Sequence, residues 1–375
     1  MTEVSQSGFE GVRYCIKCMM PSTRPRMELD QEGVCGGCRY HETQEHVDWA
    51  VRKEEFKALI AENPGNGTYD CVVPWSGGKD SSAVALHLKK DYNLNPLLVT
   101  YSPMMPTEVG NHNREALLRH GFDNVYFRPN QRVSRALARR FLIERGNPEV
   151  HRAAGINAVP VQEAVNRGIK LVIFAEHGES CYGGHILSEE HRKFRMFDEV
   201  LEHQIGDHPL NWANEEVSES DLAPYLYPEE GTEDLKVTYF GYWHKWDVRE
   251  NLNYVESQID FRRCFHERSD GTWTDYDSLD DGIDDPYFFL QFLKFGFGRA
   301  LRDAARAIQN GHMTRAEGLA MVEKYDGEPP QTFRKQWLDY VSMTEEDFRE
   351  VTDLHKNAEI WDEHSQGWSL RNPPK

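Results

Sequence analysis

A glycine- and serine-rich turn stands between two patterns that are typical of regular structure. The apolar run 71–73 is broken by Pro74, and a helical pattern begins after the string Ser-Gly-Gly-Lys-Asp-Ser-Ser at 76–82. Backbone N–H groups of paired glycines and of a helix N-terminus bind anions, and serine hydroxyls add hydrogen-bond donors. The turn therefore predicts a phosphate site. The alternative is a glycine-rich turn in which Asp80 or Ser81 only caps the helix.

The spacing of this turn differs from that of the nucleotide loop of kinases and GTPases. That loop needs Gly, four residues, then Gly-Lys-Ser/Thr, whereas here Val73 stands at the first Gly position and Asp80 follows Lys79. The string instead resembles the PP-loop of ATP pyrophosphatases, which split ATP between the α and β phosphates and adenylylate a carbonyl oxygen. The resemblance implies that Lys79 offsets the pyrophosphate charge and that Asp80 helps to hold Mg²⁺. It also implies that the pyrophosphate is bound by Ser76, Gly77, Gly78, Ser81 and Ser82.

Four of the seven cysteines form two Cys-x-x-Cys pairs separated by 16 residues. Thiolates at this spacing favour a closed, tetrahedral Zn²⁺ site, and Gly36 and Gly37 suit a tight turn in the second pair. The alternatives are an iron–sulfur cluster, whose ferredoxin spacings are absent, and free buried thiols. The predicted zinc ligands are Cys15, Cys18, Cys35 and Cys38.

Length and charge limit the class of protein. A chain of 375 residues is long enough for two or three domains, and its net charge of −19 argues against broad binding to nucleic acid. No apolar run approaches the length of a membrane span, and the first residues form no basic or apolar leader. An odd cysteine count with paired Cys-x-x-Cys motifs fits a reducing compartment. We therefore expect a cytoplasmic protein with no nucleic-acid or membrane partner.

From residue 69 onwards, short apolar runs alternate with helical patterns. This alternation predicts an α/β fold with a parallel sheet covered by helices on both faces. The expected strands are 71–73, 96–101, 124–127 and 170–175. Ligands of such sheets bind beyond the carboxyl ends of the strands. That rule brings three segments near the loop at 76–82, namely 102–104, 128–130 and 176–179.

The segment after the last expected strand is rich in polar groups. Glu176, His177 and Glu179 are followed by the turn Tyr-Gly-Gly at 182–184, which can approach a ligand closely. Clustered Glu and His side chains bind Mg²⁺ or transfer protons. The alternative is a solvated turn whose Glu176 caps a neighbouring helix.

Three later stretches are each open to two interpretations. The aromatic run 237–247 either packs in the core or stacks on a sugar or base. The six aspartates of 275–285 favour a solvated loop with helix caps, which can include a second Mg²⁺ ligand. Two glycines between Lys294 and Arg299 either bring both cations against a phosphate or carboxylate, or allow close helix packing with the charges outward.

The same patterns divide the chain into four parts. The parts are a zinc segment with a linking helix (1–62), a PP-loop domain (63–187), an acidic insertion with the rest of the catalytic domain (188–300) and a helical C-terminal region (301–375). We expect the acidic stretch 188–235 to be a solvated face and the tail 366–375 to be an extended surface segment.

Taken in order, the motifs resemble the N-acetyl sugar amidotransferases, and the likeness covers about residues 13–330. These bacterial PP-loop enzymes convert an acetamido group into an acetamidino group on sugars bound for lipopolysaccharide, nonulosonic acids or flagellar glycans. The motifs that carry the resemblance lie at 14–25, 33–38, 76–82, 182–184, 245–247, 279–284, 294–300 and 324–327.

The resemblance implies a reaction and a set of residues. ATP transfers AMP to the acetamido carbonyl oxygen of a sugar, expected to be nucleotide-linked, and ammonia then displaces AMP; the cofactors are ATP, Mg²⁺ and Zn²⁺. The implied catalytic residues are Lys79, Asp80, Lys294 and Arg299. Besides the loop, the implied nucleotide contacts are Tyr101 and Glu176. The implied substrate contacts are Glu179, Tyr182, Gly183, Gly184 and Lys245.

Partners and rival functions follow from the same comparison. The chain shows no Cys-His-Glu glutaminase arrangement, so we expect a separate glutaminase subunit to supply ammonia; a homo-oligomer is left open. One rival is a zinc-containing PP-loop tRNA sulfurtransferase, which needs a persulfide cysteine, such as Cys181 or Cys264, and a basic RNA surface. The other is a zinc-stabilised binding module with an inactive nucleotide loop.

Overall fold

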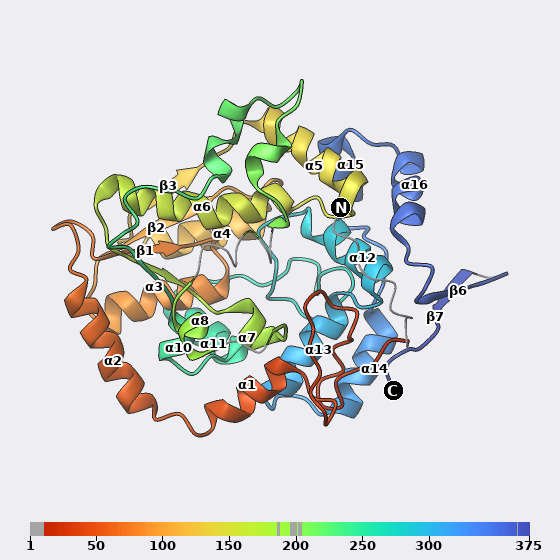
Figure 1. Cartoon of the computed structure of the whole chain (residues 1–375), viewed down its shortest axis with the longest axis horizontal. Helices are drawn as coiled ribbons and strands as arrows, with labels where there is room; N and C mark the ends of the chain where they lie inside the picture. The colour runs from red at the N-terminus through yellow and green to blue at the C-terminus, as the bar shows by residue number, and fades with distance from the viewer. Residues whose placement is uncertain (1–10, 186–187, 196–200, 202–204, 366) are drawn as a thin grey trace.

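A five-stranded parallel sheet forms the centre of the protein (Figure 1). The computed structural model describes residues 11–185, 188–195, 201, 205–365 and 367–375. The strand order is β3-β2-β1-β4-β5, and every neighbouring pair is parallel. The strands are β1 (Cys71–Pro74), β2 (Pro96–Tyr101), β3 (Asn124–Phe127), β4 (Leu171–Phe174) and β5 (Lys236–Tyr239). The predicted α/β class and the four predicted strands are confirmed.

Strand β5 was not predicted from the sequence, where most of its residues appear only as the start of the aromatic run 237–247. It pairs with β4 along its whole length, from Leu171 opposite Lys236 to Phe174 opposite Tyr239. The following residues Phe240, Trp243 and Trp246 are buried, so core packing accounts for most of the run. A four-residue edge strand among aromatics gives too short an alternation to be recognised from sequence.

Apolar side chains cover both faces of the sheet because successive strand residues point to opposite sides. Val73 packs with Phe56, Leu86 and Val255 on one face, and Val72 packs with the helices on the other. The helices before, between and after the strands include α2 (Trp49–Glu62), α3 (Lys79–Asp91), α4 (Glu108–Leu118), α5 (Gln131–Arg145), α6 (Val150–Arg167), α7 (Gly178–Tyr182), α8 (Glu189–Lys193), α10 (Phe240–Trp243) and α11 (Val248–Gln258). The sheet is therefore covered on both faces, as predicted.

The acidic stretch 188–235 is not simply a solvated face, although part of it lies outside the described residues. Its 3₁₀ segments η2 (Pro209–Trp212) and η3 (Glu219–Tyr225) bury Trp212 and Leu222, which join the core that contains α6. The acidic residues between the two segments are exposed, whereas the apolar residues within the segments contact the core.

The segment that contains the two cysteine pairs packs against the C-terminal region. Figure 1 shows the N-terminal segment beside α13 (Arg299–Gln309) and α14 (Arg315–Tyr325), and the buried cysteines share a core with Leu301 and Val322. The remaining C-terminal elements are α12 (Asp284–Phe295), α15 (Arg334–Val341), α16 (Glu345–His355) and the antiparallel hairpin β6 (Trp361–His364) and β7 (Gly367–Leu370). From residue 367 onwards the tail is largely exposed and its first part is the strand β7, so the predicted extended surface segment is confirmed there.

The predicted linking helix is two helices, α1 (Gly36–Gln44) and α2. Asp48 separates them, because its carboxylate accepts hydrogen bonds from the N–H groups of Ala50 and Val51 and starts α2 anew. Within the described residues, no helix combines the length and the apolar character that a membrane span needs.

Candidate active site between two cavities

The loop at 76–82 connects the end of β1 to the start of α3, as the sequence predicts. Gly77 has a φ of +95°, and a Cβ placed on it would lie 2.4 Å from Cγ of Arg114, so this position accepts only glycine. Gly78 caps α3 and donates its N–H to Oγ of Ser76. Residues 76–81 line a cavity of about 320 Å³, here called the loop cavity. The loop therefore presents the N-terminus of α3 to an open space.

Ser82 differs from the rest of the loop. It is fully buried, does not line the loop cavity, and its Oγ accepts a hydrogen bond of 2.9 Å from the indole of Trp75. Its hydroxyl therefore ties α3 to the end of β1.

Lys79 is buried and lies between two carboxylates. Its Nζ is 2.7 Å from Oδ2 of Asp80 and pairs also with Oδ1 of Asp277. Burial alone would lower the pKa of Lys79, but the charges of Asp277 and Asp80 outweigh it and raise the pKa. Asp80 also accepts a hydrogen bond of 2.9 Å from Asn251. Lys79 is therefore a fixed positive charge at the base of the loop cavity.

The aspartate-rich stretch 275–285 is not a solvated loop, so that expectation is wrong for most of it. Asp280, Asp281, Asp284 and Asp285 are all buried, and residues 276–280 line the loop cavity. Asp281 caps the N–H groups of residues 104 and 105, and Arg152 lies within 3.5 Å of the Asp280 and Asp281 carboxylates. The partners of these carboxylates lie far away in the sequence. The run of aspartates therefore does not indicate that its carboxylates are buried.

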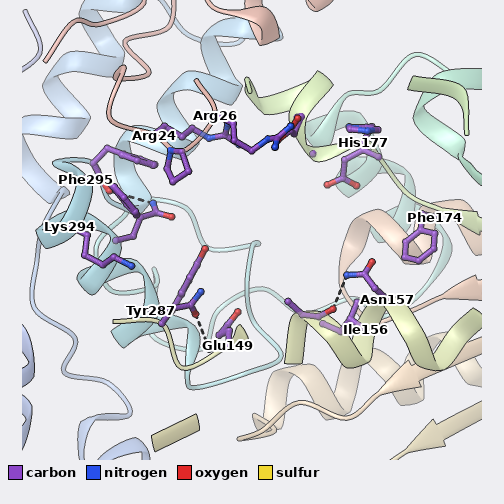
Figure 2. Close-up of a pocket in the computed structure, with 18 of the residues that line it drawn as sticks. Arg24, Arg26, Glu149, Ile156, Asn157, Phe174, His177, Tyr287, Lys294 and Phe295 are labelled. Atoms are coloured by element: carbon purple, nitrogen blue, oxygen red, sulfur yellow. Dashed lines mark hydrogen bonds and ion pairs between the residues drawn. The ribbon is translucent and has the colours of Figure 1, made fainter. Parts of the chain in front are cut away.

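A second cavity, of about 640 Å³, adjoins the loop cavity; Ile156 and Glu176 line both. We call it the large cavity. Figure 2 shows ten of its residues around an open space, with Arg24, Arg26 and His177 on one side and Glu149, Ile156 and Asn157 on the opposite side. Its walls thus come from the segment between the two cysteine pairs, from α6, from the start of α7 and from α12.

The large cavity carries an excess of positive charge. Its cations are Arg24, Arg26, Arg195 and Lys294, and its carboxylates are Glu149, Glu176 and Glu179. Burial raises the pKa of both Glu149 and Glu176, so these carboxylates take up a proton more readily than exposed ones, whereas Glu179 forms an ion pair of 2.7 Å with Arg26. The cavity is therefore suited to an anionic ligand.

Glu176 occupies the wall common to both cavities. Its Oε1 accepts a hydrogen bond of 2.6 Å from the hydroxyl of Tyr182, and the guanidinium of Arg306 lies 3.7 Å from the centre of the Tyr182 ring. Arg306 was not singled out from sequence. The available signal was its helical spacing from Arg299 and Arg302, which places three arginines along one side of α13.

Lys294 and Arg299 do not converge on one anion. Lys294 lines the large cavity and donates a hydrogen bond of 2.5 Å to the carbonyl of Arg145, and burial lowers its pKa to about 8. Arg299 is buried, lines neither cavity, donates to the carbonyl of Asp277 and lies 3.7 Å from Asp285. Arg299 therefore supports the loop that carries Asp277.

Two other residues of the expected set lie away from the cavities. Tyr101 is buried, its hydroxyl bonds to that of Tyr225, and its ring packs so closely on α6 that a Cβ on Gly155 would clash with it. Lys245 is exposed and lines neither cavity. The structure gives neither residue a direct place at the site.

Gly183 and Gly184 serve close packing. The carbonyl of Gly183 accepts a hydrogen bond from Arg24, and a Cβ on Gly183 would lie 2.9 Å from Cε of Met27. A Cβ on Gly184 would lie 2.9 Å from Cβ of Glu179. Gly183 therefore lets the cysteine-containing segment dock on the end of α7, which places Arg24 at the large cavity, and Gly184 lets the chain pass close to Glu179 of α7.

The four cysteines predicted as zinc ligands converge. All are buried, and their sulfurs lie within 4.8 Å of one another. Such a set of four thiolates fits a tetrahedral Zn²⁺ with no open coordination position, as in structural zinc sites. A Cβ on Gly37 would lie 2.7 Å from the N–H nitrogen of Gly183, so the cysteine cluster is packed directly against α7. The cluster can bind zinc and hold one wall of the large cavity.

The remaining cysteines considered as sulfur carriers are placed differently. Cys181 is buried, and burial together with the charge of Glu176 raises the pKa of its thiol well above the usual value. Cys264 is half-buried and donates to the carbonyl of Arg268. A thiol held protonated is a poor nucleophile, so Cys181 is unsuited to carry a persulfide.

Part of the chain matches the model of a known protein family. Residues 270–373 match the model of the C-terminal domain of WbpG-like proteins of lipopolysaccharide biosynthesis. No curated protein matches the chain. The matched segment contains Asp277, Arg299 and Arg306, and so reaches the wall of the loop cavity. The matched segment is confined to the C-terminal part of the chain and does not include the loop at 76–82.

Proposed function

We propose that the protein is an ATP-dependent amidotransferase that converts the acetamido group of a nucleotide-linked sugar into an acetamidino group. The observation that carries the proposal is the position of Glu176, at the shared wall of a phosphate-binding loop cavity and a larger cationic cavity. Two cavities that meet at one wall suit a reaction in which a nucleotide and a second substrate must touch. The match to WbpG-like proteins supports a sugar of lipopolysaccharide biosynthesis as that substrate.

ATP would bind in the loop cavity with its β and γ phosphates at the start of α3. The N–H group of Gly77 and the hydroxyls of Ser76 and Ser81 would donate to these phosphates, and the N–H group of Gly78 orients the Ser76 hydroxyl. Lys79 is held by its carboxylate partners and supplies a positive charge that needs no rearrangement during the reaction. Mg²⁺ held by Asp80 would neutralise charge on the departing pyrophosphate.

The sugar would bind in the large cavity. Its four cations face a ligand that carries negative charge, as the diphosphate of a nucleotide-linked sugar does. The acetamido group would point towards Ile156 and Glu176, where the two cavities meet. This arrangement directs the carbonyl oxygen towards the α phosphate of ATP.

The reaction then proceeds in two steps. The carbonyl oxygen attacks the α phosphorus, pyrophosphate leaves, and the oxygen becomes part of an AMP ester that is a good leaving group. Ammonia attacks the same carbon, the C–O bond breaks, and AMP departs. Glu176, oriented by Tyr182, is placed to accept a proton from the attacking nitrogen.

The test is to incubate the protein with ATP, Mg²⁺, ammonium chloride and a panel of nucleotide-linked acetamido sugars that includes UDP-N-acetylglucosamine. Replacement of oxygen by NH changes the sugar mass by about −1 Da, with one AMP formed for each sugar converted. Formation of ADP, or AMP formation that does not depend on any sugar, would rule the proposal out. Retention on a tRNA column with sulfur transfer would favour the sulfurtransferase alternative, and no ATP turnover with any acceptor would favour an inactive binding module.

A further inference from the structure

A third cavity lies beside the loop cavity, between the start of α11 and α13. Its volume is about 10 Å³, which is close to the space that one water-sized molecule occupies. Val248, Tyr276, Asp277, Asp303, Ala307 and His312 are among the residues that line it. We call it the small cavity.

The small cavity and the loop cavity share a wall. Tyr276 and Asp277 line both, and the two carboxylate oxygens of Asp277 have different partners: Oδ1 pairs with Lys79, and Oδ2 lies 3.1 Å from Arg306. Arg306 also packs on Tyr182, which bonds Glu176. A short chain of contacts therefore leads from the small cavity to the place where the two larger cavities meet.

Two residues of the small cavity keep buried polar atoms without a hydrogen bond in the described part of the chain. Asp303 is only 5% exposed; its Oδ2 accepts from Thr272 and Thr274, but its Oδ1 accepts no hydrogen bond and has Arg302 Nε at 3.7 Å. The second atom is Nε of Arg306. The cavity is thus lined by residues that offer one free acceptor and one free donor.

We propose that the small cavity is the entry site for ammonia in the second step of the proposed reaction, on which this inference rests. Ammonia has the size of a water molecule, donates through its N–H bonds and accepts through its lone pair, so it complements both free groups. Bound ATP and sugar would fill the other two cavities, and the third reactant therefore needs a separate approach.

The test uses substitutions of Ala307, which lines the small cavity and neither of the larger ones. Ala307→Val and Ala307→Leu place added carbon atoms in the cavity, and Ala320→Leu, at an exposed position of α14, is the matched control. The assay is AMP formation by the full-length protein at varied ammonium chloride, with whichever sugar of the panel is converted. We expect the KM for ammonium to rise with side-chain size, by about tenfold for leucine, with the KM values for ATP and sugar unchanged.

Each outcome separates the two proposals. Equal ammonium KM values in the wild type and the Ala307 variants, with amidination intact, would overturn the ammonia entry site and leave the proposed function standing. If the small cavity holds only a water molecule, the ammonium KM values will also be equal, and the ammonia entry site is overturned in that case too. Absence of amidination with every sugar would overturn both. Thermal unfolding of each variant shows whether a change in KM reflects loss of the fold, and the smaller valine variant keeps the test valid if leucine is not tolerated.

Discussion

Nζ of Lys79 pairs with Oδ1 of Asp277, across 198 positions of the chain. Lys79 belongs to the loop that begins α3, whereas Asp277 belongs to the segment that matches WbpG-like proteins. The ion pair is buried, and Arg306 binds the other oxygen of the same carboxylate. The wall of the loop cavity is therefore completed by a segment of the C-terminal half.

Removal of Asp277 should destabilise the protein. Asp277→Ala leaves the Lys79 ammonium buried beside Asp80 alone, and breaking a buried ion pair in this way costs about 3–5 kcal/mol. Urea unfolding measures the change. The control is Asp275→Ala, whose carboxylate lies 3.7 Å from Arg263 in a more exposed ion pair, and should cost less than about 1 kcal/mol. Equal losses of unfolding free energy in the two variants would show that the buried ion pair stabilises the fold no more than the exposed one.

Asp80→Ala should abolish AMP formation without unfolding the protein. Asp80 lines the loop cavity and is the expected Mg²⁺ ligand, whereas its exposed counterpart Asp91 lies at the other end of α3. Asp91→Ala should therefore keep wild-type turnover. AMP formation and circular dichroism of both variants test this expectation, and full turnover by the Asp80 variant would refute the assignment of the metal ligand.

Loss of one cysteine of the cluster should release zinc and reduce the soluble yield. Cys15→Ser removes one of the four converging thiols, on which the packing of the N-terminal segment against α13 and α14 depends. Cys264→Ser, outside the cluster, should retain the metal. Elemental analysis of the purified variants gives zinc per chain. Zinc retained in full by the Cys15 variant would mean that the cluster is not the metal site.

The affinity for the sugar should fall as the pH rises through about 8. Burial lowers the pKa of Lys294 to about 8, so the large cavity loses a positive charge above that pH and holds an anionic sugar less well. The unfolded chain keeps this proton up to about pH 10.4, so stability relative to Lys294→Met should rise with pH between these two values. The measurements are the sugar KM and the urea midpoint across this range. A pH profile of the KM unchanged in Lys294→Met would exclude this lysine as the cause.

Substitution of Gly37 should show whether docking of the cysteine-containing segment on α7 shapes the large cavity. Gly37→Ala places a Cβ 2.7 Å from the backbone of Gly183 and should loosen the contact that positions Arg24, which raises the sugar KM. Ala320→Leu, at an exposed position of α14 away from the large cavity, is the control and should have little effect. Equal sugar KM values in both variants would mean that this contact does not shape the large cavity.

The sequence was informative where the chemistry is local. The loop at 76–82 and the two Cys-x-x-Cys pairs each carry their geometry in adjacent residues, and the structure places them as expected. Pairings between distant segments were not accessible, because nothing near Asp281 indicates Arg152 and nothing near Gly183 indicates Met27. The aspartate-rich stretch therefore looked solvated, and the packing role of the Tyr-Gly-Gly turn was missed.

In the proposed reaction, AMP is transferred to the acetamido oxygen of the sugar. To test this step, that oxygen is labelled with a heavy isotope and the products are analysed by mass spectrometry after reaction with ATP, Mg²⁺ and ammonium. We expect the label to leave the sugar and to appear in the phosphate of AMP. Label that stays in the sugar, or AMP that forms without it, would rule the proposed reaction out.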